Sequence, residues 1–288
     1  MASRREIRRR IKSIKSTAQI TKAMQMVAAS RMRRAQARVS ATRAYAEHIR
    51  AIVADVAGRS GAGEHPLLAD REVKRVEIVT MTPDRGLAGA LVSNVKREIS
   101  RLVTSLDTPF DVVAVGRKGR DFVVRSRFNL VAEFTQLGDQ PSADAVGPIA
   151  QQVLDDFREG RVDKVYLIYT QFESTLRQRA RTVQLLPVVP PEGEETEGVT
   201  SPWNYEPDNP QAVLSLLLPR YLEFTLYQAL LESIASEHSA RMIAMSAATD
   251  NANELVQELT LLGNKARQAE VTKEISEISG AAEAIRTG

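Results

Sequence analysis

The chain has 288 residues, a net charge of +3, no cysteine, three histidines and only 5% aromatic residues. Disulfides, thiolate metal sites and cysteine nucleophiles are therefore excluded, and the histidines stand too far apart in the sequence to form a His-x-x-x-His metal pair. No stretch approaches the ~18 consecutive apolar residues of a transmembrane helix, so we expect no metal, no cofactor and no direct membrane insertion.

The first segment, residues 1–57, is predicted to be one long helix without proline. Apolar or small side chains recur from Ile7 to Val56 in alternating steps of four and three, interrupted only by Thr21, Gln25 and Thr42. This spacing is typical of a coiled-coil seam. The helix is therefore expected to pair along its whole length with a second helix.

A second apolar stripe lies beside this seam between residues 18 and 29. It is formed by Ile20, Met24 and Val27. A helix that is apolar on more than one side contacts more than one neighbour. The second neighbour is either a thicker local core or another protein.

The same segment is strongly basic. Residues 1–50 contain 14 Lys or Arg against two Glu, a net charge of +12, so the rest of the chain carries −9. A basic N-terminal helix that contains serine can also be an organelle transit peptide. We favour mature sequence, because the apolar repeat continues far beyond what a cleavable leader needs.

Residues 73–189 alternate between short β-rich runs and helical runs. Such alternation predicts a Rossmann-like α/β domain with a mostly parallel sheet. Strands are predicted at 76–81, 110–115, 130–134, 164–169 and, at the edge, 175–188, and helices at 87–106, 118–125 and 143–157.

The turn at residues 84–90 could belong to a phosphate-binding loop, because it contains Gly86 and Gly89. It has neither the Gly-x-Gly-x-x-Gly spacing of dinucleotide-binding sites nor the Lys-Ser/Thr ending of a P-loop. We therefore interpret the glycines as residues that permit a tight turn and close helix packing.

After an acidic, proline-rich loop at residues 190–210, a second long helix is predicted over 211–288, broken only by Pro219. It carries six basic and ten acidic side chains, a sign opposite to that of the first helix. Opposite charge favours pairing. The two terminal segments are therefore expected to form a long antiparallel coiled coil beside the α/β domain.

The second helix is longer than the first. At 1.5 Å per residue, ~54 residues extend roughly 80 Å and ~75 residues roughly 110 Å. About the last twenty residues, from Arg267, are then left without a partner in the chain. They keep an apolar stripe made of Val271, Ile275, Ile278, Ala282 and Ile285. This end is either sheathed by a partner protein or frayed; we favour the sheath, because an exposed apolar stripe is a poor feature in an isolated helix.

Several of these segments resemble signatures of the ATP synthase gamma subunit family, and the resemblance covers essentially the whole chain. The matching segments are residues 20–30, 84–87, 236–242, 247–252, 264–269 and 274–278. Ala88 and Ala90 stand where the family commonly has Cys and Gly. The cysteine-bearing insertion of the chloroplast versions is absent, which favours a bacterial-type protein.

The resemblance implies a non-catalytic central rotor shaft of a proton-translocating F-type ATP synthase. The implied partners are three alpha and three beta subunits around the coiled coil, and the epsilon subunit and membrane c-ring at the globular end. Catalysis would belong to the beta subunits. The implied location is the cytoplasmic face of the bacterial plasma membrane, as a peripheral protein.

The resemblance also implies roles for single residues. Positions that engage a loop of a beta subunit match Arg267, Gln268 and Thr272. Positions linked to coupling and rotor–stator contact match Met24, Arg241 and Glu277. Tyr205 lies in the region that faces the membrane ring, although the spacing around it is shorter than in the family.

Two other functions fit parts of the sequence. The +12 segment suggests a coiled coil that binds nucleic acid, but Tyr45 is the only aromatic residue among its charges. The second of these functions is a small α/β enzyme with helical arms. Against it, the sequence has no recognisable nucleophile, base or metal cluster.

Overall fold

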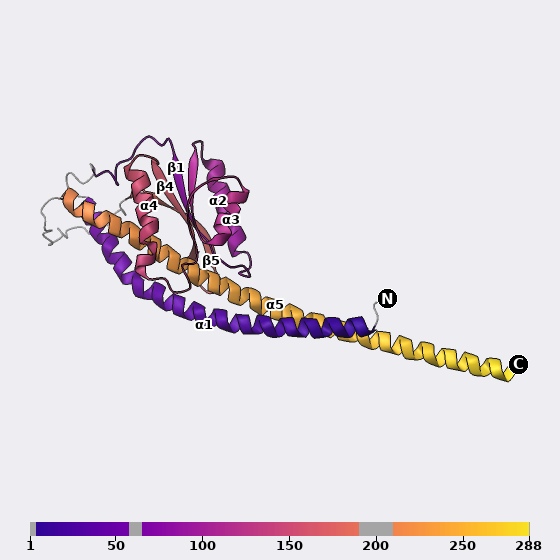
Figure 1. Ribbon diagram of the computed structural model, residues 1–288. Coiled ribbons are helices and arrows are strands. Elements are labelled where there is room, and N and C mark those ends of the chain that lie inside the picture. The colour runs from indigo at the N-terminus through magenta and orange to yellow at the C-terminus, as the bar shows by residue number, and fades with distance from the viewer. Residues whose placement is uncertain (1–3, 58–64, 190–209, 288) are drawn as a thin grey trace. The chain divides into compact units, whose positions relative to one another are not determined.

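In the computed structural model, residues 4–57, 65–189 and 210–287 are described (Figure 1). The chain divides into two compact units. Residues 28–241 form the α/β unit, and residues 1–27 together with 242–288 form the coiled-coil unit. Two long helices contribute to both units: α1 (Arg4–Ala57) and α5 (Pro210–Thr287).

A five-stranded sheet forms the centre of the α/β unit, in the order β3-β2-β1-β4-β5. Four strands are parallel and the edge strand β5 is antiparallel to β4, which confirms the mostly parallel sheet. The strands are β1 (Val76–Met81), β2 (Phe110–Val115), β3 (Asn129–Phe134), β4 (Lys164–Phe172) and β5 (Gln178–Leu186).

Helices cover both faces of this sheet (Figure 1). Helices α2 (Leu91–Ser105) and α3 (Arg117–Arg125) lie on one face, where Val95 and Ile99 pack against Val76 and Ile78. The other face packs against α4 (Gly147–Arg158), the first part of α5 and part of α1, in one continuous apolar core. Strands buried on both faces explain the nearly continuous apolar runs in the sequence.

Two predicted helix boundaries are wrong. The helix predicted from residue 87 begins only at Leu91, because Leu87 (φ 63°) and Gly89 (φ 55°) adopt left-handed backbone conformations that a right-handed helix cannot contain. The helix predicted over 143–157 starts as a short 3₁₀ turn, η2 (Ala143–Val146), before α4.

The predicted coiled-coil seam is confirmed. Every seam position of α1 whose side chain is described is buried or half-buried, from Ile7 to Val56. In the coiled-coil unit, α1 and α5 run antiparallel, since Thr21 contacts Thr249 whereas Arg4 contacts Glu270. In the α/β unit, Val53 and Val56 join the sheet core.

A pair of hydroxyl groups interrupts the apolar seam of the coiled-coil unit. The Oγ1 atoms of Thr21 and Thr249 lie 2.7 Å apart, and both residues are buried. Because each hydroxyl has a single hydrogen, one donates to the other across the seam, and the accepting hydroxyl donates within its own helix, to the carbonyl of Ala18 from Thr21 or to that of Met245 from Thr249. A single buried polar pair in an apolar seam favours one register over its neighbours.

We expect the double variant Thr21→Val, Thr249→Val to keep its helices but lose its unique register, because an apolar seam tolerates displacement by one turn, about 5 Å. Spin labels on cysteines introduced at the exposed positions Arg9 and Leu261 would report this as a broadened distance distribution. The variant Thr21→Ser, Thr249→Ser keeps both hydroxyls and should retain a single narrow distance. An equally narrow distance in the valine variant would show that packing alone sets the register.

Candidate partner-binding surface

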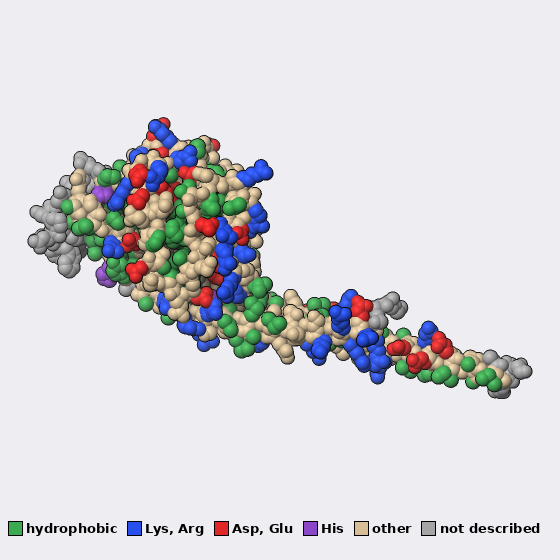
Figure 2. All heavy atoms as spheres, in the orientation of Figure 1, with side chains coloured by type: hydrophobic (Ala, Val, Ile, Leu, Met, Phe, Trp, Pro, Cys, Tyr) green, Lys and Arg blue, Asp and Glu red, His purple; other side chains and the backbone are tan. Residues whose placement is uncertain are grey.

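The C-terminal end of α5 is exposed along its whole circumference. The ion pair between Arg4 and Glu270, at 3.9 Å, joins the start of α1 to α5. Every residue from Arg267 to Ala282 is exposed, and the exposed fraction of the stripe rises to 70% at Ile278 and 83% at Ile285. Figure 2 shows these hydrophobic side chains along one side of the helix end and charged groups on the other.

Four of the predicted site residues lie on this end. Arg267, Gln268, Thr272 and Glu277 are all exposed. The Thr272 hydroxyl donates to the carbonyl of Gln268 at 2.9 Å, and Glu277 forms an exposed ion pair with Lys273 at 3.5 Å. Positions 268, 271, 272 and 275 share one helix face by their spacing, so two polar side chains border the apolar stripe.

A second exposed apolar surface lies on the coiled-coil unit. Ile20 is 59% exposed and Val27 51% exposed, while Met24 between them is half-buried. Of the two interpretations left open for this stripe, exposure favours another protein over a thicker local core. Leu261 and Leu262 of α5 in the same unit are also exposed, at 63% and 54%.

Arg241, the sixth predicted residue, is held inside the α/β unit. Its Nη2 donates to Glu237 Oε1 at 2.6 Å and to the carbonyl of Gly86 at 3.1 Å. The two side chains are only 11% and 14% exposed. Burial raises the pKa of Glu237, whereas the charge of Arg241 lowers it. Arg241 therefore ties α5 to the turn after β1, a contact that the sequence alone did not reveal.

His238 is a packed residue of the same region. It is 1% exposed, and its Nε2 lies 3.4 Å from Asp139 Oδ1. Burial is the main reason why its pKa falls to about 4, although Asp139 opposes the shift. Asp139 also pairs with Arg31 of α1. The loop that carries Asp139 thus contacts both long helices, and no local pattern in the sequence identifies it.

The turn after β1 contains a carboxylate, Asp84, that bonds to backbone N–H groups of two other segments. Asp84 accepts the backbone N–H of Arg117 at the start of α3 and that of Gln136, both at 2.9 Å. The Thr82 hydroxyl accepts the N–H of Gly119 at 2.7 Å. A free helix N-terminus attracts phosphate through such N–H groups, but these donors are already paired within the chain.

The described residues, which leave out 1–3, 58–64, 190–209 and 288, contain no helix long and apolar enough to cross a bilayer. Nor do they contain a group of three or more His, Asp and Glu side chains suited to a metal ion. Tyr205 and the rest of the acidic loop lie outside the described residues.

Comparisons with known proteins agree over the whole chain. A family model described as ATP synthase matches residues 3–285. The ATP synthase gamma chains of Roseiflexus castenholzii and Chloroflexus aurantiacus are 52% and 50% identical, over 99% of this chain and 99% of each relative.

Solved structures show the same fold. The central stalk and c-ring structure of the Tetrahymena thermophila mitochondrial ATP synthase contains a chain with a TM-score of 0.61 and 25% identity, over 80% of this chain and 99% of that one. A chain of the Euglena gracilis mitochondrial ATP synthase has a TM-score of 0.70 at 19% identity, over 99% and 95%. From its sequence, its fold and these relatives, the chain belongs to the ATP synthase gamma chain family.

Proposed function

We propose that the exposed end of α5 turns inside a bearing formed by the catalytic subunits, and that this rotation couples proton flow to ATP synthesis. As a gamma subunit of an F-type ATP synthase, the chain is the central rotor stalk, and catalysis takes place at the beta subunits. The main support for this bearing is the apolar stripe from Val271 to Ile285. It is exposed on the end of α5 that extends beyond the Arg4–Glu270 contact.

The bearing would be built by three alpha and three beta subunits around the coiled coil, with the epsilon subunit and the membrane c-ring at the α/β unit. Support comes from relatives whose structures are described as central stalk with c-ring and as F1 with c-ring. The complex would hold the chain at the cytoplasmic face of a bacterial plasma membrane, as a peripheral subunit. The match over residues 3–285 leaves no reason to retain the nucleic-acid-binding alternative.

The mechanism is differential binding. The end of α5 is apolar on one side and charged on the other, so at any angle each beta subunit meets a different surface. A surface that binds one conformation of a subunit more tightly shifts that subunit toward it. Because such coupling is reciprocal, driven rotation changes nucleotide affinity at the beta subunits, and ATP hydrolysis drives rotation the other way.

The predicted residues then have distinct roles. Arg267, Gln268 and Thr272 would engage a loop of a beta subunit, and Glu277 and Met24 would face the stator. Arg241 would act indirectly, by holding α5 against the turn after β1 through Glu237 and Gly86. Tyr205 would face the c-ring.

The assembly is tested by co-purification of the tagged full chain with alpha and beta subunits. The coupling role is tested by Met24→Lys. Since Met24 lies half-buried between the exposed Ile20 and Val27, a lysine at this position would reach a stator carboxylate. We expect the added rotor–stator ion pair to lower the number of protons pumped per ATP hydrolysed, while hydrolysis itself continues.

Met24→Leu, which conserves volume without adding charge, should behave as wild type. Raising the salt concentration should partly restore pumping in the lysine variant, since salt screens exposed ion pairs. Pumping per ATP that is unchanged in Met24→Lys would refute the contact, and absence of alpha and beta subunits from the purified complex would refute the assembly.

A further inference from the structure

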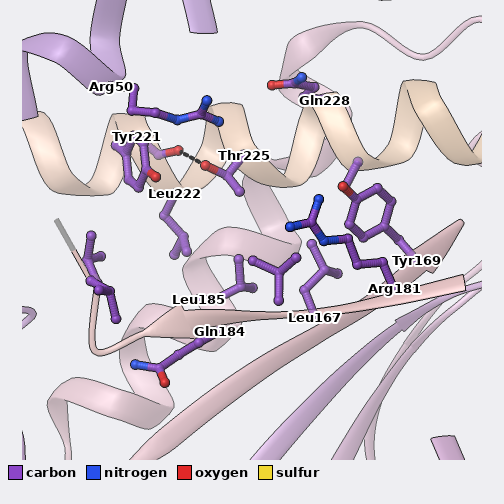
Figure 3. Close-up of a pocket in the computed structure, with 14 residues that line it drawn as sticks. Arg50, Leu167, Tyr169, Arg181, Gln184, Leu185, Tyr221, Leu222, Thr225 and Gln228 are labelled. Atoms are coloured by element: carbon purple, nitrogen blue, oxygen red, sulfur yellow. Dashed lines mark hydrogen bonds between the residues drawn. The ribbon is translucent and has the colours of Figure 1, made fainter. Parts of the chain in front are cut away.

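A cavity of about 180 Å³ lies in the α/β unit between α5 and the strands β4 and β5. Figure 3 shows it from the side, with α5 above the strands. Its lining includes Leu167, Leu185 and Leu222, which are buried to 4% exposure or less. The cavity therefore has an apolar base, as small-molecule sites commonly do.

Two arginines line the same cavity. Arg50 comes from α1 and Arg181 from β5; in Figure 3 Arg50 runs along the upper side of α5, and Arg181 lies below α5 beside Tyr169. Among the described residues Arg50 makes no hydrogen bond or ion pair, and Arg181 makes one long bond, 3.4 Å to Gln171. No described lining residue is acidic. Two guanidinium groups, both on exposed residues, thus line a cavity that has no acidic residue in its lining.

Tyr169 adds a neutral donor beside Arg181 (Figure 3). Burial and then the nearby charge of Glu232 raise the pKa of its phenol to about 12, against the effect of Arg181 and Arg50. The phenol therefore keeps its proton at neutral pH. Glu232 is not among the lining residues, and its Oε1 accepts from Gln228 at 3.3 Å.

We propose that this cavity binds an oxyanion, a carboxylate or phosphate, carried on a short apolar group. Guanidinium groups bind such oxygens through paired, charge-assisted hydrogen bonds, and bound anion would offset the repulsion between Arg50 and Arg181. The apolar group would rest on Leu167, Leu185 and Leu222. This site is independent of the bearing at the end of α5.

The test is calorimetric titration of the purified full chain at fixed ionic strength with three probes: hexanoate, inorganic phosphate and hexanol. We expect hexanoate to bind with a Kd of roughly 1 mM or tighter, and hexanol to bind at least tenfold more weakly. Phosphate that binds as tightly as hexanoate would overturn the role of the apolar group and leave a free anion as the occupant. Phosphate that binds more weakly would identify an anion with an apolar group.

Single variants locate the site. Arg50→Gln and Arg181→Gln should each weaken hexanoate binding at least tenfold. Arg179→Gln, which removes the same charge from an exposed position of β5 outside the lining, should leave it unchanged. The proposal is overturned if neither anion binds, if hexanol binds as well as hexanoate, or if all three variants weaken binding equally.

Discussion

Replacing Gly116 by alanine is expected to destabilise the α/β unit more than almost any other single substitution would. Gly116 precedes α3 with φ 90° and ψ 142°, a combination open almost only to glycine. A Cβ atom at this position would lie 1.8 Å from the carbonyl oxygen of Thr82 and 2.7 Å from its carbonyl carbon. Those atoms belong to the backbone where β1 leaves the sheet, and Thr82 N–H is bonded to the carbonyl of Val115 at 2.8 Å.

The clash cannot be relieved by rotating a side chain, so the ends of β1 and β2 would have to separate. We expect a loss of more than about 4 kcal/mol in the free energy of unfolding, a size that is exceptional for one substitution. Gly138→Ala is the matched control, since Gly138 also has a positive φ, 81°, but no atom within 4 Å of the added carbon. It should cost about 1 kcal/mol. Urea unfolding of both variants measures the difference, and equal losses would show that conformation, not contact, sets the cost.

The second large effect is a dependence of stability on pH that arises from Glu77 of β1. Glu77 is 1% exposed, and neither carboxyl oxygen has a hydrogen-bond donor. Burial, followed by the adjacent Asp156 and then Asp111, raises its pKa to about 8, with Arg161 opposing. Asp156 already accepts from Arg161 and Gln152, so only a proton on Glu77 supplies the missing donor between the two carboxyl groups.

The folded chain therefore holds a proton that the unfolded chain releases above its ordinary pKa of 4.5. This contribution is fully present below pH 4.5 and is lost as the pH rises toward 8 and beyond. At roughly 1.4 kcal/mol per pKa unit, the loss amounts to several kcal/mol. Glu77→Gln, whose amide donates at every pH, should remove that decline and be the more stable protein at pH 9.

The measured quantity is the difference in unfolding free energy between wild type and Glu77→Gln from pH 5 to pH 9. His238 has the opposite effect on stability: its pKa is about 4 in the folded chain, so the folded state loses stability as the pH falls. This effect is the same in both proteins and cancels in the difference. Glu133→Gln removes the same charge from an exposed strand position and controls for net charge. Parallel curves for wild type and Glu77→Gln would contradict the assignment.

The features that could be predicted from the sequence are those with a local period. The seam from Ile7 to Val56 and the strand–helix alternation repeat within a few residues, so pattern alone locates them. The exposed end from Arg267 follows from length, because the rise of a helix per residue is constant.

The contacts that close the fold could not be predicted in this way. Thr21 and Thr249 each interrupt an apolar stripe, but nothing local says that they pair across 228 residues. Asp84 reaches Gln136 across 52 residues, and Arg241 reaches Gly86 across 155. The candidate site divides in the same way. Its exposed part could be predicted from helix length, whereas the internal contacts of Arg241 depend on the tertiary fold and could not.

The ion pair between Arg4 and Glu270 divides the coiled-coil unit into two parts of different stiffness. Up to this contact the unit has the cross-section of two packed helices, and beyond it α5 continues as one. Resistance to twisting and bending falls steeply as a cross-section narrows. Under torque, the last turns of α5 therefore deform elastically more than the paired helices do.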